Sequence, residues 1–209
     1  MSLILELQEE CLSQASTTRL LRKAHLVAFK LGLTEFDSWI TTEMNGYTDS
    51  RSVPKYRQVA GTLKARAPEF VGGFTVNLSK QPIEVPVVLP ISVVDAAIDE
   101  PGSETQLAPN LESANALIGD APQLKGSSLF VTIPKSEMKK IPDGIRDKVL
   151  QWALELERAD ITGEGLSFTE KEKEAAKTLA AASVSVLIQG DNNGSVQIQQ
   201  KSSDASEFP

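Results

Sequence analysis

The sequence predicts an α+β fold in which helices from both ends of the chain form a layer around a small antiparallel sheet, followed by a C-terminal β-hairpin. Apolar residues recur at helical spacing near both ends, alternation and prolines replace that period in the middle, and alternation returns around an Asn-Gly turn near the end. We expect the 209 residues to divide into an α+β domain over 1–183, a hairpin over 184–199 and a disordered tail over 200–209.

The first part of the chain, residues 2–47, is predicted to form three helices joined by short connections. Ser16 and the two threonines after it are candidate caps for the second helix, and Gly32 is a candidate stop. Thr34 begins the third helix, with Asp37 in the position of a capping box. The turn Asn45-Gly46 ends it.

The middle of the chain favours strands and short helices. Alternation over 59–65 and 74–78 predicts two strands, and three prolines confine an extended segment at 83–89 to a sheet edge or a path outside the sheet. The remaining predicted elements are helices over 91–98 and 109–118 and a strand over 129–133.

Helical spacing returns after residue 140. Ile145, Val149, Trp152 and Leu156 occupy one face of an amphipathic helix. Thr169 and Glu172 then form a capping box that opens a further helix, which we expect to end near residue 182.

The predicted hairpin consists of two alternating strands around Gly190-Asp191-Asn192-Asn193-Gly194. Two isolated strands are not stable in water, so these side chains need a surface to pack against. They could extend the domain's own sheet, but we favour pairing with neighbouring chains, which makes the hairpin an oligomerisation element. Its apolar residues are Val184, Val186, Ile188, Val196 and Ile198.

Composition excludes several classes of protein. One cysteine rules out a disulfide framework, and one cysteine with one histidine rules out a Cys/His zinc site within the chain. A net charge of −7 argues against general nucleic-acid or anionic-membrane binding. There is no signal-peptide pattern and no stretch long and apolar enough to cross a bilayer, so we expect a cytoplasmic protein.

The sequence offers no recognisable set of catalytic residues. His25 and Cys11 each lie next to or within an apolar helix face, where a structural role is expected. The carboxylate spacings are those of solvated helix faces, and no glycine-rich phosphate loop is present. We therefore predict no catalytic residue, no metal site and no cofactor.

Charge is distributed unevenly along the middle of the chain. Residues 51–80 carry six cations against one acid, whereas residues 81–125 carry seven acids against one cation. A basic patch of this kind could bind nucleic acid, bind the acidic segment of another copy, or be an ordinary charged sheet face. Its candidate residues are Arg51, Lys55, Arg57, Lys64 and Arg66.

Two groups of segments resemble the AbiTii domain family of bacterial anti-phage, abortive-infection-type loci. The first group comprises Leu20-Leu21-Arg22-Lys23-Ala24, Ala28-Phe29-Lys30-Leu31, Glu35-Phe36-Asp37-Ser38-Trp39-Ile40, Glu43-Met44-Asn45-Gly46-Tyr47 and Tyr56-Arg57. The second runs from Ile145 to Glu157. The resemblance implies one family module over most of the chain and supplies no catalytic residues.

These observations lead to one expected function and two alternatives. We expect a non-enzymatic component of bacterial antiviral defence that acts by protein–protein contact and oligomerisation. Its expected partners are other copies of itself and a phage or defence-locus protein, with no membrane and no nucleic acid. The alternatives are a toxin-like nuclease or nucleotide-processing enzyme that uses Asp, Glu and Arg residues, and a nucleic-acid sensor.

Overall fold

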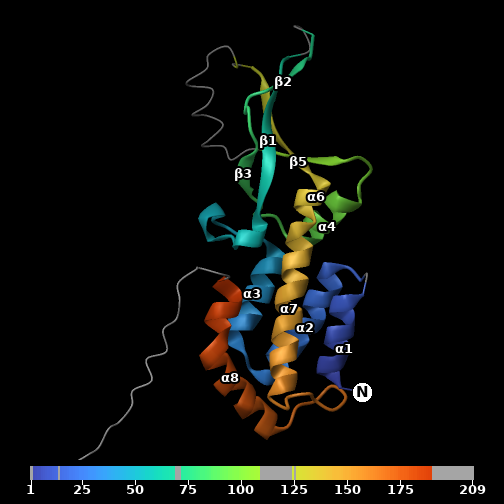
Figure 1. Cartoon of the computed structure of the whole chain (residues 1–209), viewed down its shortest axis with the longest axis vertical. Helices are drawn as coiled ribbons and strands as arrows, with labels where there is room; N and C mark the ends of the chain where they lie inside the picture. Colours follow the sequence, from blue (N-terminus) through green and yellow to red (C-terminus); the bar gives the residue numbers. More distant parts are fainter. Residues whose placement is uncertain (1, 14, 69–71, 109–123, 125, 190–209) are drawn as a thin grey trace, which may run out of the picture.

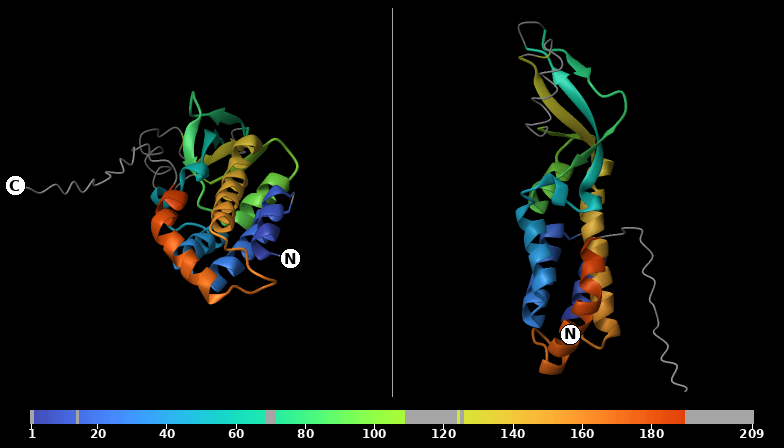
Figure 2. Two further views of the ribbon diagram at one scale, coloured as in Figure 1. Left: turned by 60° about the horizontal axis from the view of Figure 1, so that its bottom comes forward. Right: turned by 90° about the vertical axis from the view of Figure 1, so that its left-hand side faces the viewer.

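A helical bundle forms one end of the molecule, and a small sheet projects from it as an arm (Figure 1). This computed structural model describes residues 2–13, 15–68, 72–108, 124 and 126–189, and of residues 181–189 only the backbone. The predicted α+β class is confirmed. Figure 2 shows the elongated shape that the arm gives the molecule.

Five helices build the bundle around one apolar core. They are α1 (Leu3–Leu12), α2 (Thr17–Leu31), α3 (Thr34–Asn45), α7 (Lys140–Arg158) and α8 (Glu170–Gln189). The predicted stripe of α7 is buried, and its Trp152 stacks on Phe36 of α3 with 4.0 Å between ring centroids. Segments from the two ends of the chain therefore share one core.

The ends of the helices test the predicted caps. The Ser16 hydroxyl accepts a hydrogen bond from the backbone of Arg19, and Gly32 ends α2 in the left-handed region, as predicted. The capping box at Thr34 is wrong, because Leu33 precedes the helix and no side chain caps it. Asp37 instead pairs with His25 of α2, with 2.6 Å between Oδ1 and Nδ1.

The arm is an antiparallel sheet built on one long strand, β1 (Gln58–Arg66). On one side of β1 lies β5 (Ser128–Pro134), followed by β4 (Glu104–Leu107). On the other side, β2 (Thr75–Asn77) and β3 (Ile83–Pro86) follow one another along β1. The predictions at 59–65, 74–78, 83–89 and 129–133 are confirmed, whereas β4 was not predicted.

Short helices join the arm to the bundle. Two 3-10 turns, η1 (Ser50–Ser52) and η2 (Lys55–Arg57), lead into β1. α4 (Ile91–Asp99) confirms the predicted helix at 91–98, and α6 (Lys135–Met138) leads from β5 into α7. The Glu137 carboxylate of α6 accepts a hydrogen bond from the Ala60 amide of β1 at 3.0 Å, which fixes the base of the sheet.

The register gives the sheet two unlike faces, because residues directly opposite each other share a face. Odd-numbered residues of β1 lie opposite apolar residues, as in the pairs Ala65–Val76 and Leu63–Val131. Even-numbered residues carry Lys64 and Arg66, so these two cations share the polar face as predicted from the strand period.

The predicted C-terminal hairpin needs correction. The backbone of residues 184–188, predicted as its first strand, continues α8 to Gln189. An alanine-rich stretch precedes these residues and favours helix, and Val184 and Ile188 are also four residues apart, so the alternation fits a helix as well. The predicted helix at 109–118, the second strand with Val196 and Ile198, and the tail over 200–209 lie outside the described residues.

Glu172 caps α8 with more hydrogen bonds than the capping box requires. Its carboxylate accepts bonds from the backbone of Thr162, Gly163 and Thr169 and from the Thr169 hydroxyl. Burial raises the pKa of this carboxyl, but the four donors outweigh burial and hold the pKa below its ordinary value of 4.5.

We predict that Glu172→Gln lowers the free energy of unfolding at neutral pH by about 1 kcal/mol, because the neutral amide leaves the four donors at the start of α8 without a charged acceptor. A depressed folded-state pKa stabilises the protein above the unfolded-state pKa and ceases to do so as pH falls through the folded-state value. Urea unfolding at several pH values should therefore show wild type and variant converging on the acid side.

Glu174→Gln is the matched control. Glu174 lies on the same helix but pairs only with the exposed Lys177 through its side chain, so the expected change is below about 0.5 kcal/mol. Equal effects of the two substitutions at all pH values would contradict the capping role of Glu172.

Candidate functional site

A buried polar cluster lies where the arm meets the bundle. Glu43 of α3 and Arg57 of η2 are both fully buried and form an ion pair, with 2.6 Å between Nη2 and Oε2. Arg57 Nε donates to the same oxygen at 2.8 Å. The hydroxyls of Tyr47 and Tyr56 each donate to the other carboxylate oxygen at 2.5 Å.

Arg57 also binds main-chain groups in the segment that leads into α4. Arg57 Nη1 donates to the carbonyls of Val87 at 3.0 Å and Leu89 at 2.8 Å. Arg57 therefore connects α3, the start of β1 and the segment between β3 and α4. Trp39 Nε1 donates to the Tyr56 hydroxyl at 3.0 Å, which brings the middle of α3 into the same network.

The two tyrosines respond to this carboxylate. Burial first, and then the Glu43 charge, raise the pKa values of Tyr47 and Tyr56 far above the ordinary phenol value. Both hydroxyls therefore stay protonated and serve as donors. The tyrosines and Arg57 occupy both carboxylate oxygens. The cluster therefore suits a structural role, in which it fixes the arm on the bundle, better than proton transfer.

Beside the cluster, the surface forms an open hollow of about 720 Å³ between α3, the loop before β1 and the β3 edge. Trp39 and Tyr47 contribute to its lining. Its charged lining residues are the cations Arg51 and Lys55 and the acids Glu35 and Glu84. The two signs are mixed, so the hollow is not a cationic phosphate site.

The five residues of the predicted basic patch do not form one surface. Arg57 is the clearest correction, because it is fully buried against Glu43 and cannot contact a partner. Arg51 is exposed and pairs with Asp49, whose pKa the Arg51 hydrogen bond lowers, and Lys55 is exposed at the hollow.

The other two residues lie on the polar face of the arm. Lys64 pairs with Glu104 of β4, with 3.4 Å between Nζ and Oε2, and the Arg66 guanidinium lies 5.3 Å from the centroid of the Phe130 ring. Glu104 belongs to the acidic segment 81–125. The basic and acidic segments thus meet at this point within one chain.

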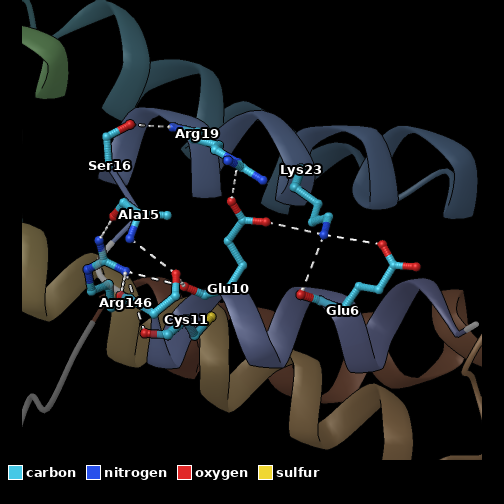
Figure 3. Close-up of polar contacts among 9 residues, drawn as sticks. Glu6, Glu10, Cys11, Ala15, Ser16, Arg19, Lys23 and Arg146 are labelled. Atoms are coloured by element: carbon cyan, nitrogen blue, oxygen red, sulfur yellow. Dashed lines mark hydrogen bonds and ion pairs between the residues drawn. The ribbon is translucent and has the colours of Figure 1, made fainter.

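A second polar network ties α1 to α2 and α7 (Figure 3). Glu10, only 7% exposed, pairs with Arg19 Nε at 2.6 Å and with Lys23 Nζ at 3.2 Å. Lys23 also pairs with Glu6. Arg146 of α7 donates to backbone carbonyls at the end of α1, those of Glu10, Cys11, Ser13 and Ala15. A cation at that position suits the negative end of the helix dipole.

The one cysteine and the one histidine of the chain both lie where a structural role is expected. Burial raises the pKa of the Cys11 thiol; Arg146 lowers it in part and Glu10 adds to the increase, so that the resulting pKa is about 11. A thiol with so high a pKa is a poor nucleophile. His25 bridges α2 and α3 through Asp37.

Within the described part of the chain, no three His, Cys, Asp or Glu residues gather closely enough to hold a metal ion. Nor does any described helix have the length and hydropathy of a bilayer-crossing segment. The contacts of the two arginines are of different kinds: Arg57 pairs with the single carboxylate of Glu43, and Arg146 donates to backbone carbonyls at the end of α1.

Sequence analysis missed Glu43 and Glu10 as the centres of the two networks. A signal for both is present in the sequence. Glu43 continues the stripe of Phe36 and Ile40 at i+3, and Glu10 continues the stripe of Leu3 and Leu7 in the same way. A carboxylate on an apolar stripe indicates a buried, paired charge, but the stripe does not identify the cation.

Comparison with known proteins yields one match. The AbiTii family model matches residues 2–181 of the chain. No curated protein and no solved structure matches.

We predict that Arg57→Met lowers the free energy of unfolding by about 3–5 kcal/mol, because Glu43 is then buried without its cation. The double variant Glu43→Leu/Arg57→Met should lose less than the sum of the two single variants, since neither charge is left unpaired. Urea unfolding followed by circular dichroism measures all three.

Arg51→Met provides the comparison, because it removes an exposed arginine and its ion pair from the neighbouring turn. It should cost less than about 1 kcal/mol. If Arg57→Met were no more destabilising than Arg51→Met, the buried ion pair would not be what holds the arm on the bundle.

Proposed function

Because the chain belongs to the AbiTii family, whose name indicates abortive infection, we propose that it is a non-enzymatic component of anti-phage defence that acts by binding another protein through its arm. The observation that carries this proposal is the outer edge of the sheet, where β2 is exposed along its whole length. The buried Glu43–Arg57 pair fixes the arm on the bundle, and the edge lies away from the helices (Figure 1).

Apolar side chains gather at this edge. Phe74 is 57% exposed, Val76 40% and Ile83 38%. Val76 and Ile83 lie opposite Ala65 and Gly61, so both belong to the apolar face of the sheet. An exposed apolar edge strand favours association with another chain.

The main chain of β2 has backbone N–H and C=O groups on its outer side that are not bonded to β1. Ala67 donates to the Phe74 carbonyl at 2.9 Å, and Leu78 donates to the Leu63 carbonyl at 2.8 Å. Even-numbered residues of this segment therefore bond to β1, and the backbone groups of Thr75 and Asn77 point away from it. No strand among the described residues pairs with that outer side.

These features suit the addition of an extended segment of a partner protein to the sheet. The exposed cations Arg66 and Lys80 lie near this edge, on β1 and on the link between β2 and β3. Charge complementarity therefore favours a partner segment with apolar residues for the exposed face and acidic residues beside them. The partner would be a phage protein or a protein of the same defence locus.

Two further observations support a binding role over a catalytic one. The most buried carboxylate, Glu43, is fully occupied by an arginine and two tyrosines. The open hollow near it mixes charges of both signs on a wide surface. A nuclease or nucleotide-processing enzyme needs a carboxylate free to bind a metal or move a proton.

The oligomerisation predicted for Val184, Val186, Ile188, Val196 and Ile198 depended on a hairpin, and its first strand is helical. The remainder lies outside the described residues. The proposed contact through β2 does not require the C-terminal segment.

We predict that Thr75→Pro and Asn77→Pro abolish phage protection when the protein is expressed in a phage-sensitive bacterium. Proline removes an outward N–H without removing a bond to β1, so the fold should persist while strand addition fails. Plaque counts measure protection, and thermal unfolding of the purified variants checks that they are folded.

Thr75→Ala and Asn77→Ala are the matched controls. They remove the same side chains and keep the outward N–H groups, so protection should remain. Full protection by the folded proline variants would contradict binding through this edge. Turnover of nucleic acid or nucleotide by the purified protein, abolished by one Asp or Glu substitution, would instead establish the enzymatic alternative.

A further inference from the structure

α2 carries an exposed basic and apolar stripe on its outer surface. The helix has four Lys and Arg residues and no acid. Arg19, Arg22 and Leu26 follow one another at spacings of three and four residues, which aligns them on one face. The Arg19 side chain is 74% exposed, Leu26 is 37% exposed and Arg22 is exposed. Phe29, 72% exposed, continues the stripe.

The neighbouring helix α1 carries a stripe of complementary character. Leu5 and Leu12 are 42% and 75% exposed, and the exposed Glu9 lies between them. Their spacings are four and three residues. Among the described residues, the side chains of Glu9 and Arg22 take part in no hydrogen bond or ion pair, so both charges are available to a partner.

The two stripes match in register. α1 and α2 are antiparallel, because Glu10 pairs with Arg19 and Glu6 with Lys23. Read from its C-terminal end, the stripe of α2 has spacings of four and three residues, from Leu26 to Arg22 and on to Arg19. The stripe of α1 from Leu5 to Leu12 has the same spacings. In an antiparallel contact, Leu5 meets Leu26, Glu9 meets Arg22, and Leu12 meets the aliphatic stem of Arg19.

These three pairs cannot form within one chain, because both stripes lie on the outside of the bundle. A second copy can form them. Rotation by a two-fold axis parallel to the helices keeps each residue at its height and lays α1 of one copy on α2 of the other. The ion pairs inside each chain show that Glu9 and Arg22 lie at nearly the same height. Every contact then occurs twice.

We propose that this protein forms a two-fold symmetric dimer in which the Leu5–Glu9–Leu12 stripe of each copy packs on the Leu26–Arg22–Arg19 stripe of the other. The interface joins apolar contacts to one charge pair on each side of the axis. It goes beyond the proposed binding through the arm, since it uses the opposite end of the molecule and needs no other protein. The arms remain free in the dimer.

Sedimentation equilibrium of the full chain over micromolar concentrations tests the dimer. The expected mass approaches twice that of one chain as concentration rises. Glu9→Arg and Arg22→Glu should each weaken the dimer by about tenfold or more, because each brings two pairs of like charges together. The double variant Glu9→Arg/Arg22→Glu restores opposite charges and should return the dissociation constant to within about threefold of wild type.

Two charge reversals on other exposed helix faces are the controls, Asp147→Arg on α7 and Lys171→Glu on α8. Both should leave the dissociation constant unchanged. Phe29→Glu at the end of the stripe should weaken the dimer, and circular dichroism confirms that each variant is folded.

A monomer at every concentration would overturn the proposal, as would a dimer that the single variants do not weaken or the double variant does not restore. A chain ending at residue 189 that dimerises while the full chain stays monomeric would show that residues 190–209 cover the stripes, which also contradicts it. The outcome is independent of the arm, because Thr75→Pro and Asn77→Pro should leave the mass unchanged.

Discussion

The ion pair between Glu43 and Arg57 holds the two parts of the molecule together, and burial is what makes it a constraint. Neither residue reaches solvent, so each charge would be costly without the other. The pair becomes tolerable because tyrosine hydroxyls and main-chain carbonyls satisfy the remaining polar atoms. Those partners come from α3, from η2 and from the segment before α4, so the arm has one preferred position on the bundle.

The contact between α1 and the rest of the bundle follows the same logic on a smaller scale. Glu10 is nearly buried and has two cations from α2, while Arg146 of α7 satisfies the carbonyls at the end of α1 (Figure 3). A helix end that is covered by other elements needs such partners. Glu6 and Glu10 pair with Arg19 and Lys23. The side chain of Arg22 has no such partner among the described residues, and it lies on the outer surface that the dimer would use.

The proposed contacts lie at opposite ends of an elongated molecule (Figure 2). The edge of β2 belongs to the projecting arm, and the stripes of α1 and α2 belong to the bundle. A dimer through the bundle would present two free edges, so that a partner with two copies of the recognised segment would be held far more tightly than one. This arrangement is consistent with the proposed function, in which the protein binds another protein through its arm.

Local sequence determined most of the elements. Periodicity placed α1, α2, α3 and α7, and the Thr169–Glu172 capping box placed the start of α8, because these signals depend only on neighbours along the chain. The sequence also predicted Lys64 and Arg66 on one strand face, since the strand period requires it. Only the tertiary structure decided that Arg57 is buried against Glu43, that Glu104 reaches Lys64, and that residues 184–188 continue a helix. The partner of a buried charge depends on which elements lie together in the folded chain. An alternating apolar pattern is compatible with a strand or a helix, and the tertiary contacts decide which one forms.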